Sequence, residues 1–116
     1  MRFREIIIVY KDTLAIKRGQ EWHLSAFPAD VGAIVRIEVE SDERVYLGFY
    51  SDEYYNIIKR KNNGSFPFSV GDDDVYFNNA YAIDKSTNYR VVVRLSLFNK
   101  EAETKLTVEL NSPPKE

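Results

Sequence analysis

The chain has 116 residues, a formal net charge of −2 and no cysteine. This length favours one domain and is enough to bury a hydrophobic core without disulfides. The absence of cysteine excludes thiol catalysis, a disulfide framework and cysteine zinc sites, and the nearly balanced charge offers no general basic field for nucleic acid or anionic lipid.

The N-terminal region contains a short apolar run that ends at Lys11. Its members are Ile6, Ile7, Ile8, Val9 and Tyr10. Such a run is too short for a secretory signal, and no other stretch approaches the roughly 20 apolar residues of a membrane helix. We therefore expect a soluble chain, with the cytoplasm favoured, and a strand at this run. A strand that is apolar on both faces suits either a strand covered on both sides or an edge strand that meets a partner, and residues 6–9 are a candidate dimer contact at an exposed sheet edge.

Three further strands are predicted in the first part of the chain, at residues 14–16, 21–27 and 33–41. Predicted turns separate them at residues 11–12, 17–20 and 28–32. The third strand has the clearest pattern, because Val35, Ile37 and Val39 alternate with charged residues. The period of two places these three side chains in the core.

A predicted turn at residues 41–44 leads to a strand at residues 45–50. Val45, Leu47 and Phe49 should face the core. Tyr46 and Tyr50 then lie on the opposite face, two positions on either side of Gly48, and are expected to point to solvent.

A single short helical turn is predicted after this strand. Ser51 is a suitable N-cap, and Asp52 and Glu53 follow it as acidic residues of the first turn. The basic residues 59–61 end the segment and suit the C-terminal end of a helix dipole. With Tyr54 and Tyr55 before them they also have the aromatic and basic character of a nucleic-acid patch, but the acidic balance of the chain favours the capping role and no nucleic-acid partner.

The last part of the chain predicts extended segments at residues 65–70, 75–83, 89–98 and 104–110. The final two should form a hairpin. A two-residue turn at residues 99–100 sets Val91 opposite Val108, Val93 opposite Leu106 and Arg90 opposite Glu109, and a four-residue turn keeps the same faces. The sequence thus predicts an all-β fold, a two-sheet antiparallel β-sandwich with one short helical turn. Residues 1–110 form its single domain and residues 111–116 a flexible tail.

Several features occur in a characteristic order along the chain. They are a turn with Gly19 before Trp22, Gly32 before a strong strand, residues 45–47 running into residues 51–55, and residues 88–93 before a terminal hairpin. Over residues 17–110 this order resembles the jelly-roll sandwiches of the GOLD (emp24-like) and bacterial pre-peptidase C-terminal type. The resemblance implies a jelly-roll-like, non-catalytic module that binds proteins or polysaccharide. The chain is expected to lack the cysteine pair, signal peptide and membrane helix of emp24-type members, so cargo sorting does not carry over.

Two polar features could support chemistry. Asp72, Asp73 and Asp74 follow Gly71 as clustered loop carboxylates, the ligands that calcium prefers, although the spacing does not match an EF-hand and solvated turn acids are the favoured explanation. No other cofactor is expected. His23 is the sole histidine, and we expect a surface or packing role for it, with no carboxylate to orient its ring.

The high share of tyrosine carries the main functional expectation, since amphipathic rings on a rigid sheet make good contact surfaces for sugars or proteins. We expect a non-catalytic binding module whose partner is a protein or carbohydrate, bound through Tyr46, Tyr50, Tyr54 and Tyr55. Two alternatives remain open. One is a structural subunit of a larger shell or surface assembly, and the other is a small carboxylate-based hydrolase using Glu38 and Glu40, which share a strand face.

Overall fold

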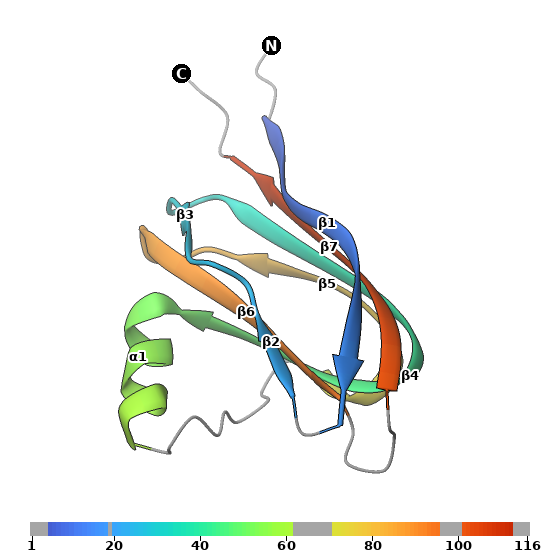
Figure 1. Ribbon diagram of the computed structural model, residues 1–116. Helices are drawn as coiled ribbons and strands as arrows, with labels where there is room; N and C mark the ends of the chain where they lie inside the picture. Colours follow the sequence, from blue (N-terminus) through green and yellow to red (C-terminus); the bar gives the residue numbers. More distant parts are fainter. Residues whose placement is uncertain (1–4, 19, 62–70, 96–100, 113–116) are drawn as a thin grey trace.

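A computed structural model describes residues 5–18, 20–61, 71–95 and 101–112, with the side chains of residues 71–74 left aside. The described chain is a folded antiparallel sheet with one helix (Figure 1). Its elements are β1 (Ile6–Lys17), β2 (Glu21–His23), β3 (Phe27–Ala29), β4 (Ile34–Ser51), α1 (Asp52–Lys61), β5 (Gly71–Ala82), β6 (Thr87–Leu95) and β7 (Glu101–Asn111). The predicted all-β antiparallel class is confirmed, and its single helix spans 10 residues.

The long strand β4 organises both layers of the sandwich. β5 pairs with it from Ile34 to Leu47, β7 pairs with residues 34–41, and β6 pairs with residues 45–51. A strand edge takes one neighbour at a time, so β7 and β6 follow one another along the edge opposite β5. β4 curves between these two regions (Figure 1). The sheet therefore folds over on itself, with β1 and β7 in one layer and β6, β2 and β3 in the other.

The predicted terminal hairpin is wrong. Val91 lies opposite Phe49 and Val108 lies opposite Ile37, so β6 and β7 each pair antiparallel with β4 and run in the same direction. Alternation determines which face of a strand is buried, but not which strand lies beside it. The end of the first predicted hairpin strand, residues 96–98, lies outside the described residues.

Three predicted turns or loops are strand instead, and a fourth, at residues 28–32, is strand at residues 28–29. β1 continues through residues 11–12 with a bulge between Ile8 and Tyr10, β4 continues through residues 41–44, and β5 already begins at Gly71. At residues 41–44 the turn-forming side chains bond to β7. The Ser41 and Thr104 hydroxyls are 3.0 Å apart, and the Glu103 amide donates to Asp42 Oδ1 at 2.9 Å. The predicted strand at residues 65–70 lies outside the described residues.

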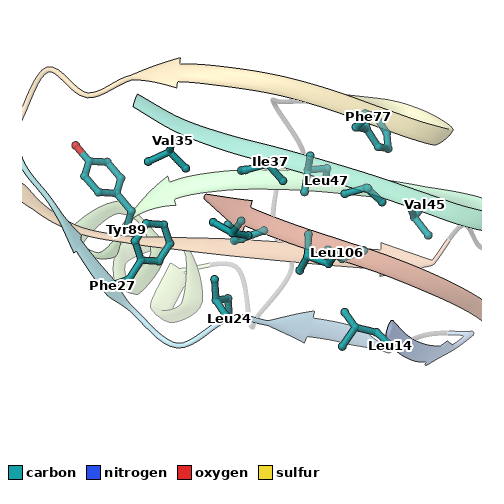
Figure 2. Close-up of a cluster of buried hydrophobic side chains, with 14 of the residues drawn as sticks. Leu14, Leu24, Phe27, Val35, Ile37, Val45, Leu47, Phe77, Tyr89 and Leu106 are labelled. Carbon is teal, nitrogen blue, oxygen red and sulfur yellow. The ribbon is translucent and has the colours of Figure 1, made fainter. Parts of the chain in front are cut away.

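The core lies between the two layers (Figure 2). Val35, Ile37, Val91 and Val93 are all fully buried, as strict alternation predicts. The same core cluster includes Leu14, Leu24, Phe27, Leu47, Phe77 and Leu106. Each aliphatic side chain buried in this way contributes about 1.5–3 kcal/mol to the free energy of folding.

Engineered cysteine pairs distinguish this topology from the hairpin. The natural chain has no cysteine, so no other thiol interferes. Glu38 and Thr107 are directly opposite on β4 and β7. We expect the pair Glu38→Cys and Thr107→Cys to form a disulfide on mild oxidation. Arg90 and Glu109 pair with opposite ends of β4, so the pair Arg90→Cys and Glu109→Cys should stay reduced. Mass spectrometry under non-reducing conditions shows whether each double variant carries a disulfide. A disulfide in the second pair alone would support the hairpin.

Candidate functional site

The helix α1 packs on the outer face of the second layer and covers part of the predicted tyrosine surface. Tyr50 is 3% exposed and Tyr55 is 4% exposed. With Ile58 from the helix and Val92 from β6 they form a second, smaller core. Alternation correctly placed Tyr50 outside the main sandwich, but it did not reveal that α1 would cover that side.

The other two predicted tyrosines are not buried in this second core. Tyr46 is half-buried, with the guanidinium carbon of Arg94 5.0 Å from the centre of its ring. Tyr54 is exposed, and its ring lies 5.9 Å from that of Tyr50. The prediction that Tyr46 and Tyr50 both point to solvent is therefore wrong for Tyr50. Together with the burial of Tyr55, this means that the four side chains do not form one continuous exposed face.

The Tyr50 ring lies directly against the strand backbone at Gly48. A Cβ atom added at Gly48 would come within 2.6 Å of the Tyr50 ring carbons Cε2 and Cζ, closer than real Cβ contacts. Both residues project to the same side of β4, because they are two positions apart. The glycine therefore allows the ring to fold down against the strand beneath α1.

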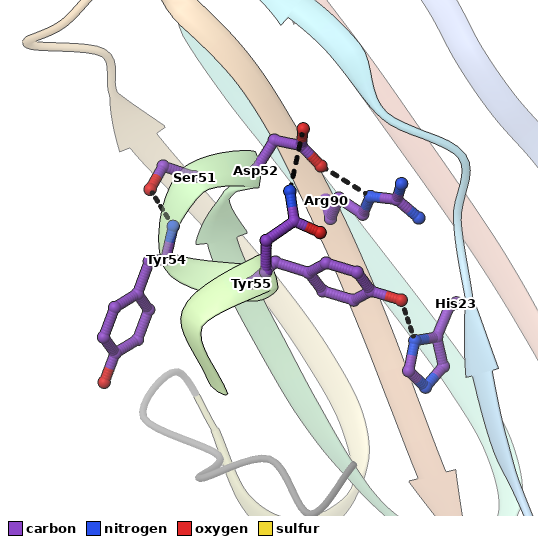
Figure 3. Close-up of polar contacts among 7 residues, drawn as sticks. His23, Ser51, Asp52, Tyr54, Tyr55 and Arg90 are labelled. Atoms are coloured by element: carbon purple, nitrogen blue, oxygen red, sulfur yellow. Dashed lines mark hydrogen bonds and ion pairs between the residues drawn. The ribbon is translucent and has the colours of Figure 1, made fainter. Parts of the chain in front are cut away.

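Polar contacts attach α1 to the sheet (Figure 3). The Tyr54 amide donates to the Ser51 hydroxyl at 3.2 Å, which confirms the predicted N-cap. Arg90 Nε on β6 donates to Asp52 Oδ1 at 2.9 Å, and the same guanidinium lies 4.3 Å from the centre of the Tyr55 ring. The first turn of the helix is thus held by an ion pair and a cation–π contact from one arginine.

His23 on β2 also contacts the helix. Its Nδ1 atom is 2.7 Å from the Tyr55 hydroxyl, and its Nε2 atom is 3.4 Å from Glu21 Oε1. The expectation that no carboxylate orients this ring is wrong. Glu21 lies two positions away on the same strand face, a spacing that the sequence already displays. The three side chains form a line of polar contacts that ends on a buried tyrosine of the helix.

One of the basic residues at the end of α1 bonds back to the helix backbone. Arg60 Nε donates to the carbonyl oxygen of Asn56 at 3.3 Å, four residues earlier. Lys59 and Lys61 are exposed. This geometry suits cations at a helix C-terminus, and the absence of a nucleic-acid partner stays a prediction. None of the helices in the described ranges is long and apolar enough to cross a membrane.

The candidate calcium ligands cannot be placed as a site. The backbone of Asp72, Asp73 and Asp74 forms the start of β5, and their side chains lie outside the described part of the structure. Elsewhere in the described residues, no three acidic or histidine side chains gather closely enough to hold a metal ion. Calcium binding at the aspartates stays a prediction.

The two glutamates of the hydrolase alternative lie on the outer face of the first layer. The Tyr76 hydroxyl donates to Glu38 Oε2 at 3.2 Å. Glu38 lines a depression of about 130 Å³ between β4, β5 and β7. Glu40 instead lines a separate depression with Lys105. The structure thus confirms that the two residues share a face, but it places them on different depressions.

The first residues of β1 form the most apolar exposed segment in the described structure. Ile6 is 62% exposed, Ile7 43% and Ile8 51%. β1 pairs with β7 along one edge, and none of the other described strands pairs with its second edge. Figure 1 shows this end of β1 projecting beyond the strands of the second layer. Of the two alternatives that the sequence left open for this apolar strand, the edge position is the one observed, and the covered one is wrong.

Comparisons with known proteins give no family. No family model matches the sequence, and no curated protein matches it. Among solved structures, a chain of the "Cyanophage Pam1 capsid asymmetric unit" aligns over 96% of this chain and 87% of its own length, with 14% identity and a TM-score of 0.46. The resemblance to GOLD and pre-peptidase C-terminal domains stays a prediction.

Replacing Gly48 tests how the Tyr50 ring is accommodated. The substitution Gly48→Ala should lower the free energy of unfolding by about 1–3 kcal/mol, since the added methyl group forces the ring off the strand. Chemical denaturation measures the change. In a Tyr50→Ala background the same substitution should cost little, because the obstructing ring is gone. An equal cost in both backgrounds would contradict this account.

The buried hydroxyl of Tyr50 predicts a loss of stability at high pH. Burial raises the pKa of Tyr50 from 10.0 to about 12, helped by the charges of Tyr54 and Glu21 and opposed by that of Arg94. The native state disfavours the ionised form of Tyr50. The contribution of this side chain to the free energy of unfolding is therefore complete below pH 10 and is lost as the pH rises toward 12.

We therefore expect the free energy of unfolding to fall by about 2 kcal/mol more in the natural protein than in a Tyr50→Phe variant over this interval. Urea denaturation at a series of pH values measures both. The Tyr50→Phe variant keeps every other titrating group and is the matched control. If the free energy of unfolding fell equally with pH in both proteins, the raised pKa of Tyr50 would be contradicted.

Proposed function

We propose that the chain is a non-catalytic assembly module that joins another protein chain through the free edge of β1. The observation that carries this proposal is the run of three consecutive exposed isoleucines, Ile6, Ile7 and Ile8, on a strand whose second edge pairs with none of the other described strands. Single exposed apolar residues are common on protein surfaces, but a contiguous group of large ones marks contact sites.

The orientation of the three side chains indicates how the partner binds. Ile6 and Ile8 lie opposite Asn111 and Glu109, which face outward, whereas Ile7 lies opposite Leu110, which faces inward. Directly paired residues project to the same side of a sheet, so the isoleucines occupy both faces of β1. A partner packed on one face would cover only part of this group. A strand added in the plane of the sheet brings side chains to both faces.

The backbone supports the same mode of binding. The Ser112 amide donates to the Glu5 carbonyl oxygen at 2.9 Å, so the ladder with β7 holds β1 extended to its first described residue. An extended strand fixed along one edge presents the amide and carbonyl groups of its other edge in the geometry that a further strand requires. The apolar side chains and the backbone therefore favour the same partner, another extended segment.

Other features support a module without catalysis. Glu38 and Glu40 line different depressions, and His23 is turned toward the helix residue Tyr55. A shell or surface subunit would use β1 in the same way as a binding module, since both require contact with another chain. The hydrolase alternative would instead require a site that brings Glu38 and Glu40 together around one substrate.

Site-specific photo-crosslinking tests this proposal. A photoreactive amino acid at Ile8, in cells that make the protein, should give a discrete crosslinked protein band, identified by mass spectrometry. The matched control places the same group at Asn56, an exposed position on α1. The additional substitution Ile7→Lys should remove the band from position 8. No discrete product at position 8, or equal products at both positions, would overturn the proposal.

A further inference from the structure

We infer that the outer face of the first layer binds a neutral oligosaccharide at the depression between β4, β5 and β7, beside the exposed residue Tyr76. This inference goes beyond the proposed function and does not depend on it, because the site uses side chains on the sheet face and not the free edge of β1. It also differs from the tyrosine surface expected from the sequence, since that surface lies around α1 on the second layer.

Cross-strand pairing gathers five polar side chains on this face. Glu38 on β4 lies directly opposite Asn78 on β5 and Thr107 on β7. Arg36 lies two positions before Glu38 and directly opposite Glu109 on β7. Paired residues, and residues two apart on one strand, project to the same side of a sheet, and all five line one depression of about 130 Å³. The backbone ladder therefore fixes the spacing of these groups before a ligand binds.

Tyr76 holds two of these side chains in place and borders the depression. Its hydroxyl donates to Glu38 Oε2 at 3.2 Å and accepts from Asn78 Nδ2 at 3.3 Å. Each contact restricts the orientation of a group that a ligand would meet, as a preorganised binding site requires. Tyr76 is 48% exposed, so apolar ring surface remains in contact with water beside the polar groups. A sugar ring matches this combination, because its C–H face packs on an aromatic ring while its hydroxyl groups form hydrogen bonds.

The mixture of donors and acceptors favours a ligand whose polar atoms are hydroxyl groups. The carboxylates of Glu38 and Glu109 only accept hydrogen bonds, the Arg36 guanidinium only donates them, and the amide and hydroxyl of the other two side chains do both. A sugar hydroxyl donates and accepts at once, so neighbouring hydroxyls of one ring serve both kinds of group. Arg36 and Glu109 are absent from the ion pairs of the described residues although they are directly opposite, so both are available to a ligand.

The charges around the depression disfavour charged ligands. Two carboxylates and one guanidinium line it, so an anion would be repelled by the carboxylates. A cation would be attracted to the carboxylates but would meet a like charge at Arg36. A neutral ligand avoids both kinds of repulsion.

The size of the depression indicates how much of the ligand it holds. It is smaller than most small-molecule pockets, so we expect one sugar unit to enter it and further units to lie along the sheet face toward Tyr76. The ligand efficiency typical of small ligands gives that unit a dissociation constant on the order of 1 mM. Binding of this strength is best followed by NMR.

Titration of the nitrogen-15-labelled chain with neutral tetrasaccharides of glucose, mannose, xylose and N-acetylglucosamine tests the inference. At least one of them should shift the backbone amide signals of residues 36, 38, 78, 107 and 109. Tyr76→Ala and Glu109→Gln should each weaken its binding at least fivefold, because they remove the ring surface and one acceptor. Tyr54→Ala, which removes an equally exposed ring on α1, and Glu43→Gln, which neutralises an exposed carboxylate on β4, are the matched controls and should leave the dissociation constant unchanged.

Putrescine, an organic cation, and glycine, a zwitterion, are titrated in parallel. No shift with any of the sugars, shifts of this face only with putrescine or glycine, or sugar binding that Tyr54→Ala abolishes and Tyr76→Ala does not, would each overturn the inference. The same spectra show whether a variant is folded, and Glu109→Gln preserves the shape of the side chain if Tyr76→Ala disturbs the sheet. None of these outcomes changes the crosslink expected at Ile8, so the inference and the proposed function fail separately.

Discussion

The fold depends on one constraint, which is that a single long strand must bury the same face in two different layers. The odd-numbered residues of β4 face the core both before and after its curve, where Val35 and Ile37 belong to one layer and Val45 and Leu47 to the other. Because odd-numbered positions are buried on both sides of residues 41–44, the strand can change its neighbours from β7 to β6 without exposing its apolar side. The curve in β4 brings these two sets of side chains together.

The same constraint explains what the sequence could and could not predict. Alternation is local information, so it identified the buried positions Val91 and Val93 and the capped helix after Ser51. Pairing is not local. A hairpin between β6 and β7 and the observed pairing of both with β4 bury the same residues, and only the structure distinguishes them. The turns expected at residues 11–12 and 41–44 failed because polar residues also suit the outward positions of long strands.

Functional residues were predictable to a similar extent. The sequence showed that Ile6, Ile7 and Ile8 belong to a strand that is apolar on both faces, but a strand covered on both sides has the same pattern, and only the structure identifies the edge. The tyrosines were misplaced in part, because Tyr50 points away from the main core and yet lies beneath α1. The contact between Glu21 and His23 was visible as a two-residue spacing, whereas the hydroxyl of Tyr55 reaches His23 only through the docking of the helix.

The two ends of the sandwich therefore differ in how their apolar side chains are covered. At α1, Tyr50 and Tyr55 were expected to be exposed for binding. They instead pack between the helix and the sheet, with the Arg90 guanidinium against the Tyr55 ring. At β1 the apolar side chains have no such cover in the described structure, and the backbone edge beside them is free. Pairing in the plane of the sheet is the contact that satisfies both the backbone and the side chains.

Amide hydrogen exchange across β1 tests that contact most directly, because it reports on individual backbone groups. In dilute protein, the amides of β1 that bond to β7 should be protected, and those on the free edge between Ile6 and Tyr10 should exchange rapidly. In the assembled state the free-edge amides should become protected as well. Association that leaves these amides exchanging as fast as in the monomer would contradict the account.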